Sequence, residues 1–198
     1  MAIHLHAGDL PDGLSFGQSV AIDSEAMGLN PHRDALTVVQ LSAGDGDAHV
    51  VQLQRPDYYA PNLKRLMTDA GVLKIFHFGR FDIAMFARYL GVMTTPVYCT
   101  KTASKLARTY TDRHGLKDVT RELLGLEISK AQQSSDWGAD ELTPEQLNYA
   151  ASDVLSLHVP LTERSRTPSP ASERCSTRPS PPTPRARPSA ASRPSSRP

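Results

Sequence analysis

Two acidic residues placed one residue apart, Asp23 and Glu25, end an apolar run that begins at Ser19. In a β-strand the two side chains would lie on the same face. Buried acids on one face repel each other, and a cation between them removes that repulsion. The pair therefore predicts part of a metal site. The alternative is an ordinary solvated strand end, since such a pair arises easily by chance among 21 acidic residues.

Three further residues could complete such a site. Asp82 falls in the first turn of a predicted helix over residues 80–91, where the helix dipole favours a carboxylate. Tyr149 and Asp153 are four residues apart, so they share one face of a later predicted helix. A carboxylate within an apolar helix face needs a reason, and a shared cation would supply one.

Four carboxylates and one phenol suit phosphoryl transfer assisted by two metal ions. Oxygen ligands of this kind favour Mg²⁺ or Mn²⁺. Two such ions about 3.5–4 Å apart can activate a water and stabilise the leaving oxygen. The Tyr149 hydroxyl could orient that water. A tyrosine with an ordinary pKa near 10 is a weak base at neutral pH, so the ions should do most of the activation.

The elements that must position these residues are predicted as strands and helices of an α/β protein. The segments 20–25, 36–41 and 48–53 are short and β-branched, with turns between them, which predicts an antiparallel meander. The nearly continuous apolar run 72–78 is typical of a central strand covered on both faces. Other predicted elements are an edge strand within 2–18, a strand at 97–99, and helices at 61–70, 101–110, 115–124 and 143–159. The last helix would start with a capping box of Thr143 and Gln146 and end before Pro160.

In order and spacing, these segments resemble the three motifs of the DEDD-type 3′–5′ exonucleases, and among them the ribonuclease D group. Asp23 and Glu25 resemble the first motif, residues 77–82 the second and residues 149–153 the third. The tyrosine marks the "y" subclass, because the "h" subclass would carry histidine where Asn148 stands. The resemblance covers about residues 1–160. It implies a ribonuclease H-like fold, a mixed sheet with three antiparallel strands first, then parallel strands, flanked by helices.

The resemblance also implies an activity. Nucleoside 5′-monophosphates would be released from the 3′ ends of single-stranded RNA, such as tRNA precursors or small RNAs. The carboxylates of Asp23, Glu25, Asp82 and Asp153 would hold the two ions, with Tyr149 as the fifth catalytic residue. A DNA exonuclease stays open, because discrimination depends on contacts to the 2′-hydroxyl. A non-catalytic nucleic-acid-binding module on the same fold is a further alternative.

Substrate contacts are expected beside the motifs. Gly28 and Leu29 match the family's segment after the first motif, where a leucine typically wedges against the terminal base. Met27, His77 and Phe81 are further expected pocket residues, with core packing as the alternative for Met27 and Phe81.

A basic cluster is a second expected contact with substrate. Lys101, Lys105 and Arg108 share one helix face by their spacing and could contact phosphates. The alternative is an ordinary solvated face.

The composition divides the chain into a predicted catalytic domain over residues 1–163 and a tail over residues 164–198. The first part carries a net charge of −6 and the tail +7. Arginine, proline and serine dominate the tail, so it should be disordered. It is either a native segment that touches RNA phosphates or the product of a lost reading frame, and we favour the second slightly.

Cys99 and Cys175 are the only cysteines, and no apolar run reaches membrane-spanning length. We expect a protein of the reducing cytoplasm, without a membrane segment, disulfide framework or obligate protein partner. No helical HRDC domain follows the predicted catalytic domain, which is typical of a short single-domain form of the ribonuclease D group.

Overall fold

The computed structural model describes residues 2–129 and 131–164, and of residues 159–164 only the helical backbone. This part of the chain forms a six-stranded sheet with strand order β1-β4-β3-β2-β5-β6. The strands are β1 (Ile3–Ala7), β2 (Ser19–Ala26), β3 (Leu36–Ser42), β4 (Ala48–Gln52), β5 (Leu73–Phe76) and β6 (Val97–Cys99). The β2–β3 and β3–β4 pairs are antiparallel, whereas β1–β4, β2–β5 and β5–β6 are parallel. The predicted mixed sheet of an α/β protein is confirmed.

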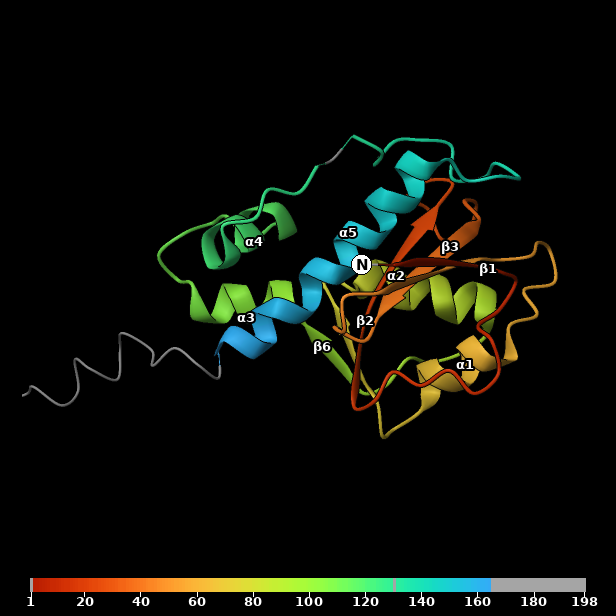
Figure 1. Cartoon of the computed structure of the whole chain (residues 1–198), viewed down its shortest axis with the longest axis horizontal. Coiled ribbons are helices and arrows are strands. Elements are labelled where there is room, and N and C mark those ends of the chain that lie inside the picture. Colours follow the sequence, from red (N-terminus) through yellow and green to blue (C-terminus); the bar gives the residue numbers. More distant parts are fainter. Residues whose placement is uncertain (1, 130, 165–198) are drawn as a thin grey trace, which may run out of the picture. The chain divides into compact units, whose positions relative to one another are not determined.

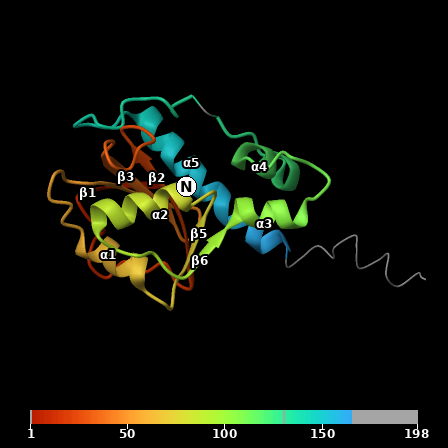
Figure 2. The same cartoon turned by 180° about the vertical axis from the view of Figure 1, so that it is seen from behind.

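Helices cover both faces of the sheet. They are α1 (Pro61–Thr68), α2 (Arg80–Met85), α3 (Thr100–Ala107), α4 (Leu116–Leu124) and α5 (Pro144–Arg164). Helix α5 crosses one face, while α1 and α2 lie on the other, as the two opposite views show (Figures 1 and 2). The helix predicted over 80–91 is divided, because a π-helical turn, η1 (Phe86–Leu90), follows α2. Gly91 ends it with a left-handed φ of 69°.

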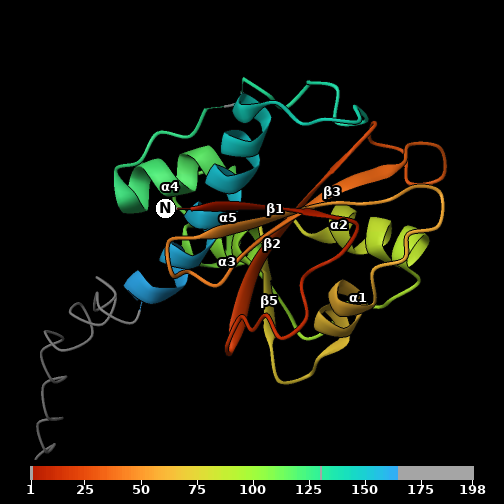
Figure 3. The ribbon, with the colours of Figure 1, turned by 45° about the vertical axis from the view of Figure 1, so that its right-hand side comes forward.

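The strands place alternate side chains on the two faces. Toward α1 and α2, Val20 and Ile22 of β2 pack with Leu63 of α1 and Phe86 beyond α2 in the larger apolar core. Toward α5, Ala21 of β2 packs with Ala151, Val154 and Leu157. By the same alternation Asp23 and Glu25 project to the α5 side of β2. Figure 3 shows the ribbon of α5 on one side of the strands and α1 and α2 on the other. The fold therefore presents both acids to the helix that carries Asp153.

The start of α5 is fixed by the predicted capping box. Gln146 N–H donates to Thr143 Oγ1 at 3.2 Å, and Thr143 N–H donates to Gln146 Oε1 at 2.9 Å. Further along, buried His158 places Nε2 3.1 Å from the backbone nitrogen of Ala21 and 2.8 Å from the carbonyl oxygen of Ser42. A Cβ at Gly44 would lie only 2.8 Å from this ring, and its φ is +82°. The capping box thus fixes where α5 begins, and His158 holds the helix against β2 and β3.

The predicted end of this helix was wrong. Helix α5 continues past Pro160 to Arg164, five residues beyond the expected stop. A proline inside a helix removes one N–H donor, and a helix can continue through that loss. The predicted disorder of the tail concerns residues that, apart from Arg164, lie outside the described part of the chain. No helix in the described residues is long and apolar enough to cross a membrane.

Candidate active site

Three predicted metal ligands converge at one end of β2. Asp23 and Glu25 of β2 and Asp153 of α5 each offer an oxygen atom, and these atoms all lie within 4.8 Å of one another. Asp153 reaches the pair because Ala150, Ala151 and Val154 on the same helix are fully buried against the sheet. The spacing of oxygens suits a divalent cation, since carboxylates this close repel each other without one.

The fourth carboxylate, Asp82, comes from the opposite layer. It lies in the first turn of α2 and is 4 % exposed. Its Oδ1 accepts a 2.6 Å hydrogen bond from the hydroxyl of Ser24, the residue between the two acids of β2. Asp82 also raises the pKa of both Asp23 and Glu25 by charge repulsion, so it lies close enough to act with them.

The electrostatics of the cluster favour a bound cation. Burial, followed by repulsion from Asp82, Asp153 and Glu25, raises the pKa of Asp23 well above its usual range. Burial and the neighbouring carboxylates raise the pKa of Glu25 to about 8. Burial also raises the pKa of Asp82 to about 6, against the hydrogen bond from Ser24. Hard oxygen donors with this surplus of negative charge fit Mg²⁺ or Mn²⁺.

Tyr149 lies beside the carboxylates, one helical turn before Asp153. Burial and repulsion from Asp153, Glu25 and Asp23 raise the pKa of its hydroxyl far above the ordinary value. The ring packs against Trp137, with 6.1 Å between ring centroids. Tyr149 therefore stays protonated at neutral pH and can donate a hydrogen bond, in line with the predicted orienting role.

A cleft of about 740 Å³ opens in front of these residues. Its lining includes Asp23, Glu25, Asp82 and Tyr149 together with all five predicted pocket residues, Met27, Gly28, Leu29, His77 and Phe81. The side chain of Leu29 is 87 % exposed, so it is available to a ligand rather than part of the core. The core alternative for Met27 is likewise unsupported, since that side chain is 55 % exposed, whereas Phe81 also packs against the larger core.

His77 lines both this cleft and a smaller cavity of about 300 Å³. Its Nδ1 is 2.8 Å from Thr100 Oγ1, and burial lowers the pKa of the imidazole to about 4, with a further contribution from Lys101. The smaller cavity is lined by Asp153, Lys101 and Lys117 among others. The ammonium group of Lys101 lies 4.0 Å from the ring centroid of Phe78. A cation is thus present next to the carboxylate cluster, whereas exposed Lys105 lines neither cavity.

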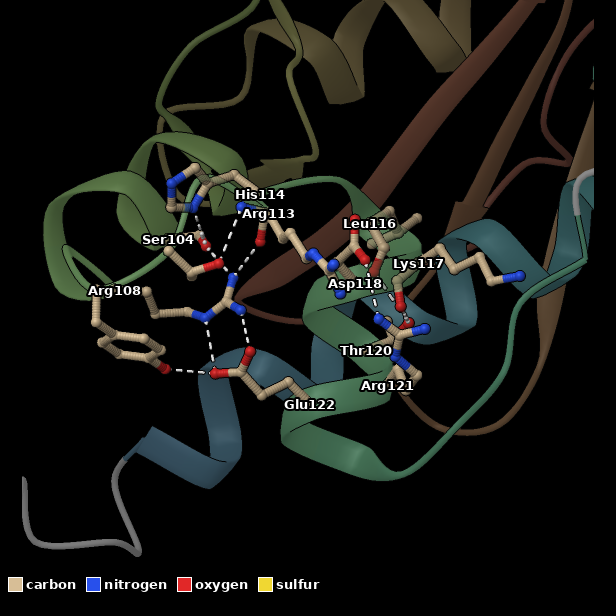
Figure 4. A network of polar contacts seen from close by, with 12 residues as sticks. Ser104, Arg108, Arg113, His114, Leu116, Lys117, Asp118, Thr120, Arg121 and Glu122 are labelled. Atoms are coloured by element: carbon tan, nitrogen blue, oxygen red, sulfur yellow. Dashed lines mark hydrogen bonds and ion pairs between the residues drawn. The ribbon is translucent and has the colours of Figure 1, made fainter.

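The structure corrects the predicted basic face at Arg108. Arg108 follows the last residue of α3, and its φ of −108° and ψ of 60° depart from the helical conformation that would align it with Lys101. Its guanidinium is buried and forms an ion pair with Glu122 of α4. It also donates to Ser104 Oγ at 2.9 Å and to the Arg113 carbonyl at 2.7 Å (Figure 4). Arg108 therefore joins α3 to α4 and is not exposed to a phosphate.

Three residues that contact the site were not predicted from the sequence. Gln40 of β3 donates through Nε2 to Asp23 Oδ2 at 3.3 Å. Ser24 holds Asp82, and Trp137 packs on Tyr149. A polar residue inside an otherwise apolar strand was the available signal for Gln40.

Comparison with known proteins adds the family. A model of the 3′–5′ exonuclease family matches residues 9–163. The chain belongs to the 3′–5′ exonuclease family. The predicted resemblance is therefore confirmed, and this exonuclease is a hydrolase of the general type that includes ribonuclease D and NrnC.

Solved relatives of this exonuclease include NrnC from Brucella melitensis. The structure bound to pGG is 52 % identical, with a TM-score of 0.79 and 88 % of each chain covered. The structure with bound Mg²⁺ is 53 % identical, with a TM-score of 0.79, 84 % of this chain covered and 81 % of the other. The Escherichia coli ribonuclease D structure, at 24 % identity and a TM-score of 0.63, shows the shared fold.

Curated relatives of this exonuclease include ribonuclease D from Granulibacter bethesdensis, 34 % identical over 138 residues. That match covers 70 % of this chain and 34 % of the relative. DNA polymerase I from Aquifex aeolicus is 32 % identical, with 69 % of this chain and 22 % of the relative covered. The chain thus spans about a third or less of the length of these curated relatives.

Proposed function

We propose that this exonuclease removes nucleoside 5′-monophosphates one at a time from the 3′ ends of short single-stranded RNAs in the cytoplasm, with two divalent cations. The observation that carries the proposal is the group of Asp23, Glu25 and Asp153, whose oxygens lie within 4.8 Å in a cleft of substrate size. Support for RNA comes from relatives named ribonuclease D, and support for a short substrate from a relative bound to pGG, a dinucleotide.

The four carboxylates have distinct places in this proposal. Asp23 would be shared between the two ions, Glu25 would hold the ion that serves the attacking water, and Asp82 and Asp153 would complete the ligand set. When bound, the ions would lower the pKa of the attacking water and stabilise the leaving 3′-oxygen. Mg²⁺ is favoured by the Mg²⁺-bound relative, and Mn²⁺ fits the same oxygen donors.

The remaining side chains would bind and orient the RNA. The Tyr149 hydroxyl, protonated at neutral pH, donates to the attacking water or to an oxygen of the scissile phosphate. Leu29 and Phe81 provide apolar surface for the 3′-terminal base, with Met27, Gly28 and His77 forming the rest of that wall. Lys101 lies where it can offset the charge of a phosphate beside the carboxylates. Lys105, exposed on α3, would contact only a longer strand.

A DNA substrate is the second candidate, and the similarity to DNA polymerase I favours it. RNA and DNA differ in the 2′-hydroxyl group, which only RNA can offer to the protein for hydrogen bonding. Matched RNA and DNA oligonucleotides of one sequence therefore separate the two candidates: the proposal expects faster turnover of RNA, and equal rates would assign the activity to both.

The direct test is digestion of a short RNA labelled at its 5′ or its 3′ end, with Mg²⁺, Mn²⁺ or EDTA, by the wild-type chain and the Asp23→Ala variant. We expect 3′-label to leave first as a mononucleotide, and a 5′-labelled ladder that shortens stepwise. EDTA and Asp23→Ala should each abolish both signals. Activity that persists in EDTA would contradict the metal-dependent reaction, and internal cleavage products would contradict the exonuclease direction.

A further inference from the structure

Gln40 is a polar side chain in a place where strands usually carry apolar ones. It lies in β3 and is fully buried, with Val38 on the same face of the strand. Its Cα partner across the antiparallel β2–β3 pair is Asp23. Burial of an amide is unfavourable unless its hydrogen-bonding groups find partners. The partners of Gln40 therefore indicate why the residue is there.

The amide nitrogen of Gln40 serves both acids of β2. Nε2 donates to Asp23 Oδ2 at 3.3 Å. The same side chain also interacts with the Glu25 carboxylate, the second acid on this face of β2. A primary amide has two N–H groups, so one nitrogen can donate to two carboxylates. Gln40 thus joins the two acids from the strand beside them.

The amide oxygen shows that this orientation is imposed by the acids. Among the described residues, Gln40 Oε1 is buried and has no hydrogen-bond partner. Rotating the amide would point Oε1 at two carboxylates, and two acceptors repel each other. The fold accepts an unpaired oxygen because the nitrogen must face Asp23 and Glu25.

We infer that Gln40 is a positioning residue that orients the Asp23 and Glu25 carboxylates for metal binding. The inference rests on the proposed function, since it assigns these two acids to the ions. Side chains that hydrogen-bond to metal ligands hold them in one orientation, and their loss typically lowers metal affinity or activity about 10–100-fold. Gln40 lines neither the cleft nor the smaller cavity, so it would act through the two acids.

The variant that isolates this role is Gln40→Met, which keeps the length of the side chain and removes both N–H donors. We expect kcat to fall about 10-fold or more and the Mg²⁺ concentration for half-maximal rate to rise about 10-fold. KM for the RNA should change less than about twofold, because the substrate wall of the cleft is untouched. The increase in melting temperature on adding Mg²⁺ to the EDTA-treated protein should shrink in the variant, which reports metal binding without turnover.

Ser42→Ala is the matched control. Ser42 lies two residues along the same strand and is fully buried, but its hydroxyl donates to the Asp47 carbonyl and not to an acid of the site. This variant should lower the melting temperature and leave the Mg²⁺ dependence as in the wild type. Should Gln40→Met not fold, Gln40→Asn keeps an amide that is one methylene too short to reach both acids, and we expect the same direction of change.

The outcomes separate the two levels of inference. A folded Gln40→Met variant with wild-type kcat and wild-type Mg²⁺ dependence would overturn the role of Gln40. A shift in Mg²⁺ dependence that Ser42→Ala shares would overturn it too, because the effect would then be a general loosening of β3. Absence of exonuclease activity in the wild-type chain with Mg²⁺ and Mn²⁺ would instead overturn the proposed function.

Discussion

The Ser24 hydroxyl on β2 donates a 2.6 Å hydrogen bond to Oδ1 of Asp82 on α2. Ser24 lies between Asp23 and Glu25, so strand alternation turns it to the opposite face of the sheet. Residues 23–25 of β2 therefore contact helices on both faces of the sheet. Asp23 and Glu25 lie beside Asp153 of α5, and Ser24 donates to Asp82 of α2. This explains how carboxylates from β2, α2 and α5 are brought together at one end of β2.

Ser24→Ala should reduce activity more than stability. Without the hydroxyl, Asp82 loses a donor that favours its ionised form, and it is no longer fixed beside the pair. We expect kcat to fall about 10-fold, as for other residues that support metal ligands. Ser24→Thr keeps the hydroxyl and should retain most of the activity. Steady-state kinetics at saturating Mg²⁺ would check this, and equal rates for Ser24→Ala and the wild type would contradict it.

Tyr149→Phe should remove the proposed orienting hydroxyl and leave the fold intact. The ring can still pack on Trp137, so the melting temperature should be nearly unchanged. Positioned proton donors and acceptors typically contribute about 10²–10⁴-fold, and we expect a kcat loss near the lower end of that range. Because the pKa of Tyr149 is raised far above its ordinary value, its ionisation should produce no change in the wild-type pH–rate profile up to pH ~10.

The sequence was sufficient for the strand order of the meander and for the acids that the fold brings together. Alternation along β2 alone places Asp23 and Glu25 together, and the interval of four places Tyr149 next to Asp153 on α5. Both patterns are local, so they depend only on the geometry of one element. The capping box of α5 is local in the same sense, and the structure contains both of its hydrogen bonds.

The features that escaped prediction depend on contacts between distant residues. Gln40 acquires its role from the register of β3 against β2, and Arg108 from the approach of α4, which carries Glu122. The spacing 101, 105, 108 would align three basic side chains only in a helix that continues, whereas α3 ends at Ala107. Pro160 shows the opposite kind of error. A proline usually ends a helix, but α5 continues past it to Arg164.

The carboxylate cluster predicts a specific dependence of stability on pH in the absence of metal. The pKa of Glu25 is raised to about 8 in the folded chain, so between about pH 4.5 and pH 8 the folded state binds the proton more tightly than the unfolded state. Stability associated with this group is therefore present at low pH and is lost as the pH rises.

Glu25→Gln should relieve that loss. In EDTA, the melting temperature of Glu25→Gln minus that of the wild type should increase from pH 5 to pH 8, and Mg²⁺ should remove most of the difference by stabilising the wild type. Because the comparison is between two variants at the same pH, titration of His6 and His49, whose pKa values are lowered by burial, cancels. A difference that stays constant across this pH range would show that the Glu25 pKa is not raised.

Arg108→Ala and Lys101→Ala should separate structural from substrate-binding cations. Removing Arg108 leaves Glu122 and the buried hydroxyl of Ser104 without their partner, so the free energy of unfolding should drop. A buried pair broken on one side typically costs about 3–5 kcal/mol, and we expect about 2 kcal/mol because the Glu122 side chain is 40 % exposed. Lys101→Ala should leave stability within about 0.5 kcal/mol and raise KM for RNA, since Lys101 lines the smaller cavity together with Asp23 and Asp153. Urea denaturation and steady-state kinetics on both variants provide the check; a higher KM for Arg108→Ala at full stability would restore that residue to the RNA-binding surface.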